Sequence, residues 1–360
     1  MSAATIRGFN RTILLAGAPF LGLLLWLIFS ADPIEVSMSE RAFPSYTGTN
    51  MSPVTASEPI NNSLDQAMST ADLTAASIQH QMKLYTHMNT AIKAISNIAS
   101  AQAPRPLVIY DTRITNKLGK PSATIDSSKM RAQLFYLGTT SFKSYAVKIE
   151  LRHSDAMQLL LGKDTNGGSE TTLAAVQRVK AAIGINAGGF ADSQSGRYPL
   201  STTIVDSNYV NGFEASFKDL FFVGMNMNNQ LIGGKFSSKE QLDRLNPKFG
   251  ASFVPILLVN GNKTTIPSKW KTSPKRAPRT VIANYKDDQL LFIVADGYSE
   301  AGSSGATLEE MQDMLVRYGA IDGYNLDGGG SSTLIFNGKL INKPSDGVLR
   351  KLPTNFVFFK

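Results

Sequence analysis

The sequence predicts an α+β protein, a mixed β-sheet with flanking helices, preceded by one N-terminal transmembrane helix and a helical stalk. Three observations lead to this prediction. Residues 12–30 carry no charged side chain, residues 64–102 contain neither proline nor glycine, and residues 105–360 alternate strand-like and helix-like patterns. The predicted domains are therefore a membrane anchor over 1–31, a linker and stalk over 32–104, and a folded domain over 105–360.

The uncharged run is just long enough to cross a bilayer core of about 30 Å as a helix. Arginines, including Arg11, precede it, and acidic residues, including Asp32, follow it. This charge bias places the N-terminus inside and the rest of the chain outside. A cleaved signal peptide is the alternative, but Phe29 fits poorly in a small-x-small cleavage site ending at Ala31. We therefore expect a single-pass signal-anchor in the cell membrane, with the C-terminal domain extracellular.

The segment after the anchor changes composition once. Residues 32–63 are rich in serine, threonine, proline and asparagine, which indicates a flexible linker. Residues 64–102 then show apolar residues at alternating four- and three-residue steps, interrupted by Asn89 and Ser96. These apolar positions include Ile78, Met82, Tyr85, Ile92 and Ala99. They predict a helical stalk with possible self-association, and a lone helix packed on the domain is the alternative.

The patterns beyond the stalk mix strands with helices. Residues 145–151 alternate apolar and polar side chains as a half-buried strand does. Residues 169–182 have the spacing of an amphipathic helix, with Leu173, Val176 and Val179 on its inner face. The Asn-Gly pairs at 260–261 and 337–338 interrupt β-type runs and predict tight hairpin turns.

Cysteine content and charge exclude several classes of site. The chain has no cysteine, which rules out a disulfide framework, a cysteine nucleophile and any thiolate metal site. The formal net charge is +8, and nine basic residues but no acidic residue lie between Asp243 and Asp287. This stretch favours an anionic ligand. No nucleic-acid-binding module is recognisable, so we expect no nucleic-acid partner.

Three strand-like runs each end in a polar side chain followed closely by glycine, at Asn186, Asp296 and Asp327. Glycine at such a position lets a ligand or another backbone approach closely. The runs before the two aspartates are separated by a helix that begins with a capping box at Thr307 and Glu310. A strand–helix–strand crossover predicts parallel strands, which brings both aspartates to one edge of the sheet.

A predicted hairpin adds a basic group to this edge. Residues 280–285 and 289–294 form its arms around Asp287-Asp288, a register that places Arg279 opposite Asp296. The amides of residues 328–332 could form a nest that binds phosphate. The alternative is that Arg279 and Asp296 form only a structural ion pair and that the glycines serve tight turns.

At these residues the sequence resembles the phosphodiester glycosidase family. The matching stretches are INAGGF (185–190), APRTVIA (277–283), VADGYSEAGSSGATLEEM (294–311), YNLDGGGSSTL (324–334) and NGKLINKPSD (337–346). The resemblance covers roughly Arg131 to Lys360. The LDGGGSS run, combined with an upstream PRT and DG, makes it specific. Ala187 stands where a glycine is usual, and Leu200 where the family often has glycine.

The resemblance implies a set of site residues. It places Asp327, Asp296 and Arg279 as the catalytic residues. It implies substrate binding by Asn186, Gly188, Gly189, Gly328, Gly329, Gly330, Ser331 and Ser332. We expect Asp327 to activate water or attack the anomeric carbon, Asp296 to support it, and Arg279 with the amides to stabilise the departing phosphate.

The expected activity is hydrolysis of a sugar-1-phosphodiester linkage in a phosphate-containing glycan of the cell envelope or an exopolysaccharide. Two alternatives remain open: a non-catalytic phosphoglycan-binding wall protein and an exopolysaccharide-processing glycosyl transferase. No cofactor is assigned and the metal ligands are unknown. Two aspartates with an asparagine would also suit Ca²⁺ or Mg²⁺, so a divalent cation stays an open expectation.

Overall fold

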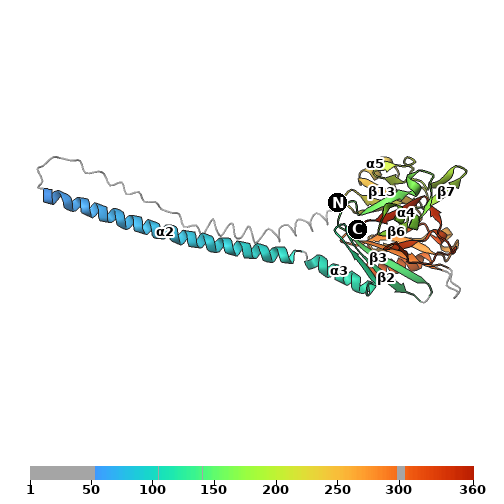
Figure 1. Ribbon diagram of the computed structural model, residues 1–360, viewed down its shortest axis with the longest axis horizontal. Coiled ribbons are helices and arrows are strands. Elements are labelled where there is room, and N and C mark those ends of the chain that lie inside the picture. The colour runs from blue at the N-terminus through green and yellow to red at the C-terminus, as the bar shows by residue number, and fades with distance from the viewer. Residues whose placement is uncertain (1–52, 104, 140, 298–304) are drawn as a thin grey trace. The chain divides into compact units, whose positions relative to one another are not determined.

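A computed structural model describes residues 53–103, 105–139, 141–297 and 305–360 (Figure 1). The predicted transmembrane helix over 12–30 lies outside these residues. Within the described ranges, none of the helices combines the length and the apolar content that a membrane crossing requires. The chain divides into two compact units, Met1–Ala91 and Ile92–Lys360.

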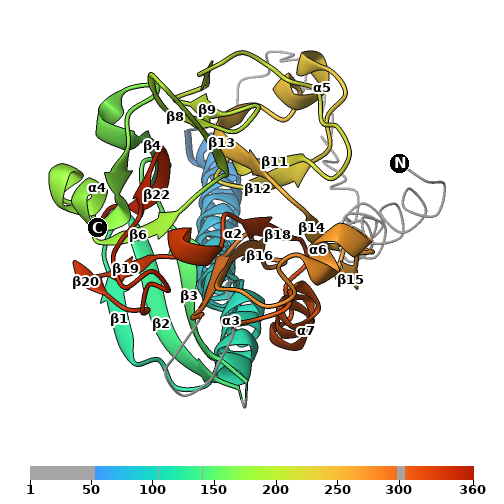
Figure 2. The ribbon, with the colours of Figure 1, turned by 90° about the vertical axis from the view of Figure 1, so that its right-hand side faces the viewer.

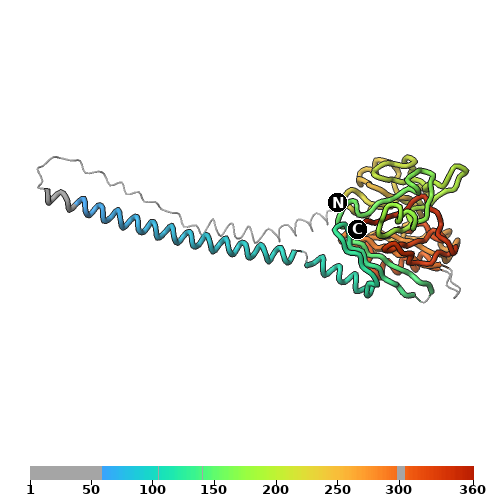
Figure 3. The backbone as a smooth tube through the Cα atoms, in the orientation of Figure 1, coloured from blue at the N-terminus to red at the C-terminus, as the bar shows by residue number. Residues whose placement is uncertain are grey.

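Helix α2 (Pro53–Gln102) occupies the predicted stalk and runs as one long helix (Figure 3). It begins before the expected Leu64, inside the segment predicted as linker. That segment has no glycine between residue 53 and the stalk, and helix propagation adds one hydrogen bond for each residue fixed. The structure describes the side chains of α2 from Pro59 onward. All of these side chains are exposed except that of Asn89, which is half-buried.

Helix α3 (Arg105–Leu118) begins with Pro106 in its first turn, where the missing N–H of proline costs nothing. It buries Ile114 and Leu118 against the folded domain. The remaining helices are α4 (Thr172–Val179), α5 (Lys239–Asp243), α6 (Ser268–Thr272) and α7 (Leu308–Tyr318), with 3-10 turns η1 (Gly162–Asp164) and η2 (Gly329–Ser331).

The largest sheet has eight strands in the order β1-β2-β3-β17-β16-β18-β14-β15. Its strands are β1 (Ala123–Asp126), β2 (Met130–Gly138), β3 (Lys143–Leu151), β14 (Ile256–Val259), β15 (Asn262–Lys263), β16 (Arg279–Asn284), β17 (Leu290–Ala295) and β18 (Gly323–Leu326). This sheet carries most of the candidate site, because β16, β17 and β18 lie side by side in it.

Two five-stranded sheets and two two-stranded sheets complete the domain. One sheet, ordered β10-β9-β13-β11-β12, contains β9 (Ile204–Val205), β10 (Asn208–Tyr209), β11 (Phe221–Asn226), β12 (Leu231–Gly234) and β13 (Pro247–Phe253). The other, ordered β20-β19-β6-β22-β4, contains β4 (Met157–Leu161), β6 (Ile183–Asn186), β19 (Leu334–Phe336), β20 (Lys339–Leu340) and β22 (Thr354–Phe358). The two-stranded pairs are β5 (Glu170–Thr171) with β21 (Lys351–Leu352), and β7 (Phe190–Ser193) with β8 (Gly196–Pro199).

The α+β class is confirmed, but the expectation of a mixed sheet is wrong for the described strands, which all pair antiparallel. The crossover through α7 does join two strands that run in the same direction. Strand β16 lies between β17 and β18 and is antiparallel to both, so the two never pair directly.

The main core lies between the sheets, and the opposite face of the large sheet packs against α3 and α7 (Figure 2). Tyr145, Val147 and Ile149 face the main core as their alternation predicts. Lys148 faces the other way, is 3% exposed, and makes an ion pair with Asp111 of α3. A buried lysine therefore anchors α3 to the sheet.

Several local predictions are confirmed. The 260–261 and 337–338 turns have positive φ at both residues, 51° and 78° in the first and 50° and 73° in the second. Helix α4 places Leu173, Val176 and Val179 in one apolar cluster. Helix α7 begins with the complete Thr307–Glu310 capping box.

Some of the basic residues between Asp243 and Asp287 form ion pairs with acidic side chains of α7. Arg276 pairs with Glu310 at 2.5 Å, Lys271 lies 3.6 Å from Glu309, and Lys263 pairs with Asp313. These three cations are therefore neutralised within the domain.

Candidate functional site

Arg279, Asp296 and Asp327 meet at one edge of the large sheet. Asp296 directly follows β17, Asp327 directly follows β18, and Arg279 is the first residue of β16. Because β16 is antiparallel to both neighbours, its first residue lies beside their last residues. The strand direction inferred from the crossover therefore located this edge correctly.

The predicted pairing of Arg279 with Asp296 is wrong by one residue. Arg279 pairs with Ala295, because the hairpin loop contains three residues, 286–288, rather than two. The loop closes with a hydrogen bond from the Tyr285 amide to the Gln289 carbonyl at 2.8 Å, and Asp288 has φ of 63°. A one-residue shift moves a side chain to the other face of a sheet. Arg279 therefore faces α7, and Asp296 faces the main core.

Both carboxylate oxygens of Asp296 are occupied. Oδ2 accepts a hydrogen bond from the Tyr145 hydroxyl at 2.9 Å, and Oδ1 accepts one from the Lys343 amide at 2.9 Å. Burial raises the pKa of Asp296, and these two hydrogen bonds oppose the rise. Asp296 thus ties the 342–343 segment to β3.

The carboxyl of Asp327 is held on one oxygen only. Oδ1 accepts a hydrogen bond from the Gly328 amide at 3.0 Å, whereas Oδ2 is buried and has no hydrogen-bond partner. Burial raises the pKa of Asp327 to about 6, a rise limited by the Ser331 hydroxyl and the Gly328 amide. The positive charges of Arg350 and Arg197 limit it further. Such a carboxyl is poised for proton transfer near neutral pH.

Arg350 and Arg197 were not found from the sequence. Arg350 binds Asp346 through Nη2 at 2.6 Å and approaches the Ser331 hydroxyl through Nη1 at 3.4 Å. The acidic residue four positions before Arg350 was the available signal, but such spacing is common on protein surfaces.

Arg197 is held in the β7–β8 hairpin. Its Nε and Nη2 atoms bind the two carboxylate oxygens of Asp192 at 2.6 Å and 3.0 Å. Its guanidinium carbon lies 4.3 Å from the centroid of the Phe190 ring. The hairpin therefore fixes a guanidinium, paired with Asp192, that lowers the pKa of Asp327.

Asn186 connects two sheets beneath the site. It ends β6, is fully buried, and donates from Nδ2 to the Asp327 carbonyl at 2.6 Å. Its Oδ1 accepts from the Thr280 hydroxyl at 2.8 Å and from the Thr333 amide at 3.0 Å. These bonds assign Asn186 a positioning role, and its contact with a sugar hydroxyl stays a prediction.

Gly188 and Gly189 pack against β13. A Cβ atom on Gly188 would lie 2.6 Å from the Ala251 Cβ, and one on Gly189 would lie 2.7 Å from the Phe253 ring. These glycines are required for close packing of β13. Substrate binding by Gly188 and Gly189 stays a prediction.

The predicted amide nest is largely occupied by the protein itself. The Gly328 amide binds Asp327, the Gly329 amide binds the Pro278 carbonyl at 2.9 Å, and the Ser331 and Ser332 amides close the η2 turn. Among residues 328–332, all of which are described, only the Gly330 amide makes no such bond. A Cβ at Gly330 would meet Asp346 Oδ2 at 1.9 Å and Arg350 Nη2 at 2.2 Å, so glycine here makes room for the Arg350–Asp346 pair.

Arg279 borders a cavity of about 230 Å³. The cavity is lined by Phe253, Val254, Trp270, Pro274, Ala277, Arg279, Leu308, Asn325, Asp327, Gly328 and Gly329. The Arg279 guanidinium donates to the carbonyls of Ala306 at 3.2 Å and Pro274 at 2.9 Å. Burial lowers its pKa to about 10, so it remains charged at neutral pH.

Asn325 adds an unused acceptor to this cavity. It is 2% exposed, and its Nδ2 donates to the Val254 carbonyl at 2.6 Å, while Oδ1 has no partner. Arg279 forms no ion pair with any described carboxylate. The cavity therefore suits a ligand that brings an anionic group and a hydrogen-bond donor.

The part of the chain that the structure describes contains no group of three or more histidine, aspartate or glutamate residues arranged to hold a metal ion. His153 makes an exposed contact with Asp155. A divalent cation stays an untested expectation.

The family model for phosphodiester glycosidases matches residues 179–359, a range that includes β6, β16, β17 and β18. The chain belongs to the phosphodiester glycosidase family. The match contains Asn186, Arg279, Asp296 and Asp327, as the sequence stretches predicted, and also Arg197 and Arg350.

Curated relatives of this phosphodiester glycosidase domain are distant. The SPbeta prophage-derived uncharacterized protein YomE of Bacillus subtilis is 29% identical over 185 residues, which are 50% of this chain and 28% of YomE. Human N-acetylglucosamine-1-phosphodiester alpha-N-acetylglucosaminidase is 28% identical over 173 residues, which are 44% of this chain and 33% of the human protein. The chain thus spans about a third or less of these two relatives.

A solved structure shares the fold. The zebrafish N-acetylglucosamine-1-phosphodiester alpha-N-acetylglucosaminidase catalytic domain, auto-inhibited by pro-peptide, superposes with a TM-score of 0.54 at 19% identity. The superposition covers 67% of this chain and 87% of the zebrafish domain. At this identity the likeness establishes the common fold of the phosphodiester glycosidase domain.

Proposed function

We propose that this chain is an extracytoplasmic hydrolase that cleaves a sugar-1-phosphodiester linkage in a phosphate-containing glycan of the cell envelope or an exopolysaccharide. Family membership supports the reaction class, as do relatives named for this activity. The observation that carries the proposal is the Asp327 carboxyl, with a pKa raised to about 6, one unbonded oxygen, and two arginines in its field.

Asp327 acts as the general base in this proposal. Its Oδ2 takes a proton from water while the water oxygen forms a bond to the anomeric carbon. The bond from that carbon to the phosphate oxygen breaks, and its electron pair leaves with the phosphate. A base with a pKa near 6 is largely ionised at pH 7 and still accepts a proton effectively. Direct attack by Asp327 on the anomeric carbon is the other form of this step.

The departing group is an anion, so positive charge near it lowers the barrier. Arg350 and Arg197 supply such charge on the Asp327 side. Arg279 and Asn325 supply a buried cation and an acceptor in the adjoining cavity, where they would hold another part of the substrate. Asp296 has both oxygens bonded, so in this proposal it takes no proton and supports Asp327 by holding the 342–343 segment in place.

The location and anchoring belong to the same proposal. The uncharged run over 12–30 and the charges around it support a single-pass anchor with the domain outside. Protease added to intact cells should then release the domain. A domain that stays intact until the cells are lysed would place it inside and contradict the topology.

Product analysis tests the reaction. The full chain would be incubated with an α-GlcNAc phosphodiester, alongside Asp327→Asn, Arg279→Ala and the matched surface control Asp313→Asn, whose carboxylate is exposed. We expect free reducing sugar from the wild type and the control, and strong loss in the other two. A new glycoside would instead support the transferase, and an intact ligand that stays bound would support a non-catalytic binding protein. Full activity in Asp327→Asn and Arg279→Ala would refute the site.

A further inference from the structure

One face of α2 carries a continuous seam of residues spaced as in a coiled coil. Its large side chains are widely exposed: Leu64 60%, Ile78 53%, Met82 65%, Tyr85 63% and Ile92 54%. We define the α2 seam as Leu64, Met68, Ala71, Ala75, Ile78, Met82, Tyr85, Asn89, Ile92, Ser96 and Ala99. These positions follow alternating steps of four and three residues, which is the a/d spacing of a heptad repeat.

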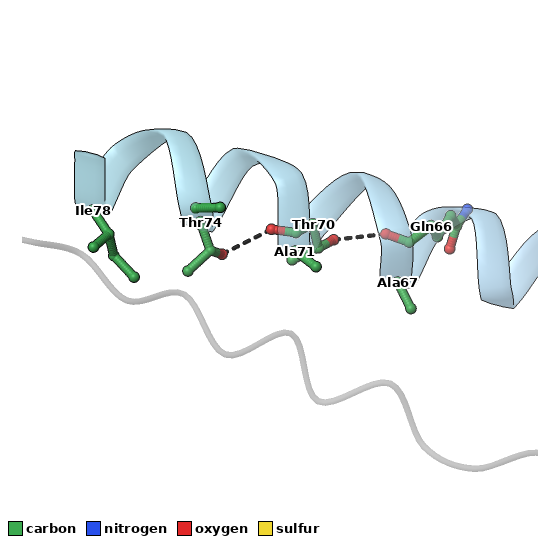
Figure 4. A pocket seen from close by; sticks show the side chains of 7 residues that line it. Gln66, Ala67, Thr70, Ala71, Thr74 and Ile78 are labelled. Carbon is green, nitrogen blue, oxygen red and sulfur yellow. Dashed lines mark hydrogen bonds between the residues drawn. The ribbon is translucent and has the colours of Figure 1, made fainter. Parts of the chain in front are cut away.

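Seam residues near the start of α2 lie on one side of the helix. Figure 4 shows Ala71 and Ile78 pointing to the same side of the helix. The hydroxyls of Thr70 and Thr74 donate to main-chain carbonyls four residues earlier, at 2.8 Å each, so they present little free polarity (Figure 4). In proteins, most of the stability of a helix comes from packing its apolar face rather than from intrinsic propensity. We therefore expect the α2 seam to pack against a partner.

Charged residues beside the seam distinguish the partner. Asp65, Asp72 and Lys93 occupy the same heptad position, because they are separated by multiples of seven residues. This is the e position of the heptad. In a parallel, in-register pair an e position lies beside a g position of the other helix. Asp65, Asp72 and Lys93 would then lie beside Ile60, Ala67 and Met88 of the second copy, respectively. Each charge would then face an apolar side chain.

An antiparallel pair gives a different result. Equivalent positions then face each other across the interface, and Asp65 of one copy lies beside Lys93 of the second copy. The same register stacks Met82 on Ile78 and Met68 on Ile92 of the second copy, with the centre of the pair near Gln79. In this register Asp65 of the first half of α2 meets Lys93 of the second half, whereas Asp72 lies beside Thr86.

We propose that α2 forms an antiparallel coiled coil with α2 of a second copy of this chain. Charge complementarity favours this partner, because the Asp65 and Lys93 side chains beside the seam meet a residue of opposite charge only when the two α2 helices are antiparallel. The two ion pairs between Asp65 and Lys93 select the direction, and the apolar layers supply the affinity.

Single-cysteine variants test the direction directly, because the wild-type chain has no cysteine. Full-length Gln79→Cys should form an intermolecular disulfide under mild oxidation, since the two Gln79 positions face each other only in the antiparallel pair. Leu64→Cys should not, because it lies opposite Ser96 of the second copy. Crosslinking of Leu64→Cys without Gln79→Cys would establish a parallel pair and overturn the proposal.

A charge-swap series provides the second readout. We expect Asp65→Lys and Lys93→Asp each to weaken dimerisation several-fold by light scattering, and the double variant to restore it. Both single variants should leave glycosidase activity unchanged, since no residue of the site is altered. A monomeric wild-type chain at tens of micromolar, or swaps without effect on association, would refute the antiparallel dimer whatever the enzyme's activity.

Discussion

The side-chain amide of Asn186 lies 2.6 Å from the main-chain oxygen of Asp327, to which it donates a hydrogen bond across two sheets. Asn186 ends β6 of a five-stranded sheet, and Asp327 follows β18 of the eight-stranded sheet. One buried amide thus fixes the residue that we propose as the base. The position of Asp327 depends on how the two sheets pack together, as well as on its own strand.

Asn186→Ala should destabilise the domain by about 2–4 kcal/mol, because it leaves the Asp327 carbonyl, the Thr280 hydroxyl and the Thr333 amide without their partner. Urea unfolding measures this change. Asn166→Ala removes an exposed bond to Asn211 and should cost less than about 0.5 kcal/mol. Equal effects of the two substitutions would contradict the linking role of Asn186.

Arg350→Gln should shift the acidic limb of the pH–rate profile to higher pH. Arg350 lowers the pKa of Asp327, so removing its charge lets that pKa rise above about 6, and more of the base is protonated at a given pH. The limb of kcat/KM against pH measures the shift. Arg317→Gln, on the exposed side of α7, serves as the control. An unchanged limb in Arg350→Gln would remove Arg350 from the site.

Asp327→Asn should raise the stability of the domain at pH 7.5 while it strongly lowers the activity. The folded-state pKa of Asp327 is raised to about 6, so ionisation costs stability as the pH rises through that value. The amide is neutral at every pH, and its gain over wild type should be about 1–3 kcal/mol at pH 7.5 and fall toward zero near pH 4. Thermal melts at both values test this. A variant less stable than wild type at pH 7.5 would show that the carboxylate is structurally required.

Asp111→Asn should destabilise the packing of α3 by about 3 kcal/mol, because it leaves Lys148 buried without its counter-ion. Burial raises the pKa of Asp111, but hydrogen bonds from Lys148 and Gln289 outweigh it and the net pKa is lowered. Its contribution is therefore present above the unfolded pKa and lost as the pH falls through the folded value. Denaturant unfolding at pH 7 and pH 3 measures both parts.

Asp313→Asn is the matched control for this prediction, because the Lys263–Asp313 pair is exposed. It should cost under about 1 kcal/mol. A loss in Asp111→Asn no larger than this would contradict the anchoring of α3 by Lys148.

Local signals in the sequence predicted some element boundaries, although α2 begins before the expected Leu64 and α4 is shorter than the predicted helix over 169–182. The Thr307–Glu310 capping box, the two Asn-Gly turns and the strand before Asp327 all act through neighbouring residues, and the structure contains each of them. The edge shared by Asp296 and Asp327 also followed from strand direction alone.

Features that depend on contacts between distant parts of the chain could not be predicted from the sequence. The register of Arg279 depended on a three-residue loop whose αL residue is an aspartate, a weak signal compared with Asn-Gly. Arg197 and Arg350 reach Asp327 from other segments of the chain, and the acidic residue four positions before Arg350 is too common a pattern to mark it. The amides of the glycine run are occupied by partners such as the Pro278 carbonyl, which only the packed fold supplies.

The pH dependence of kcat/KM on a sugar-1-phosphodiester tests the proposed role of Asp327 most directly. The wild-type rate should fall below an apparent pKa of about 6, and Asp327→Asn should lower the rate about 10²- to 10⁴-fold and remove that limb. An Asp327→Asn enzyme that keeps the wild-type rate and the same acidic limb would show that another group is the base.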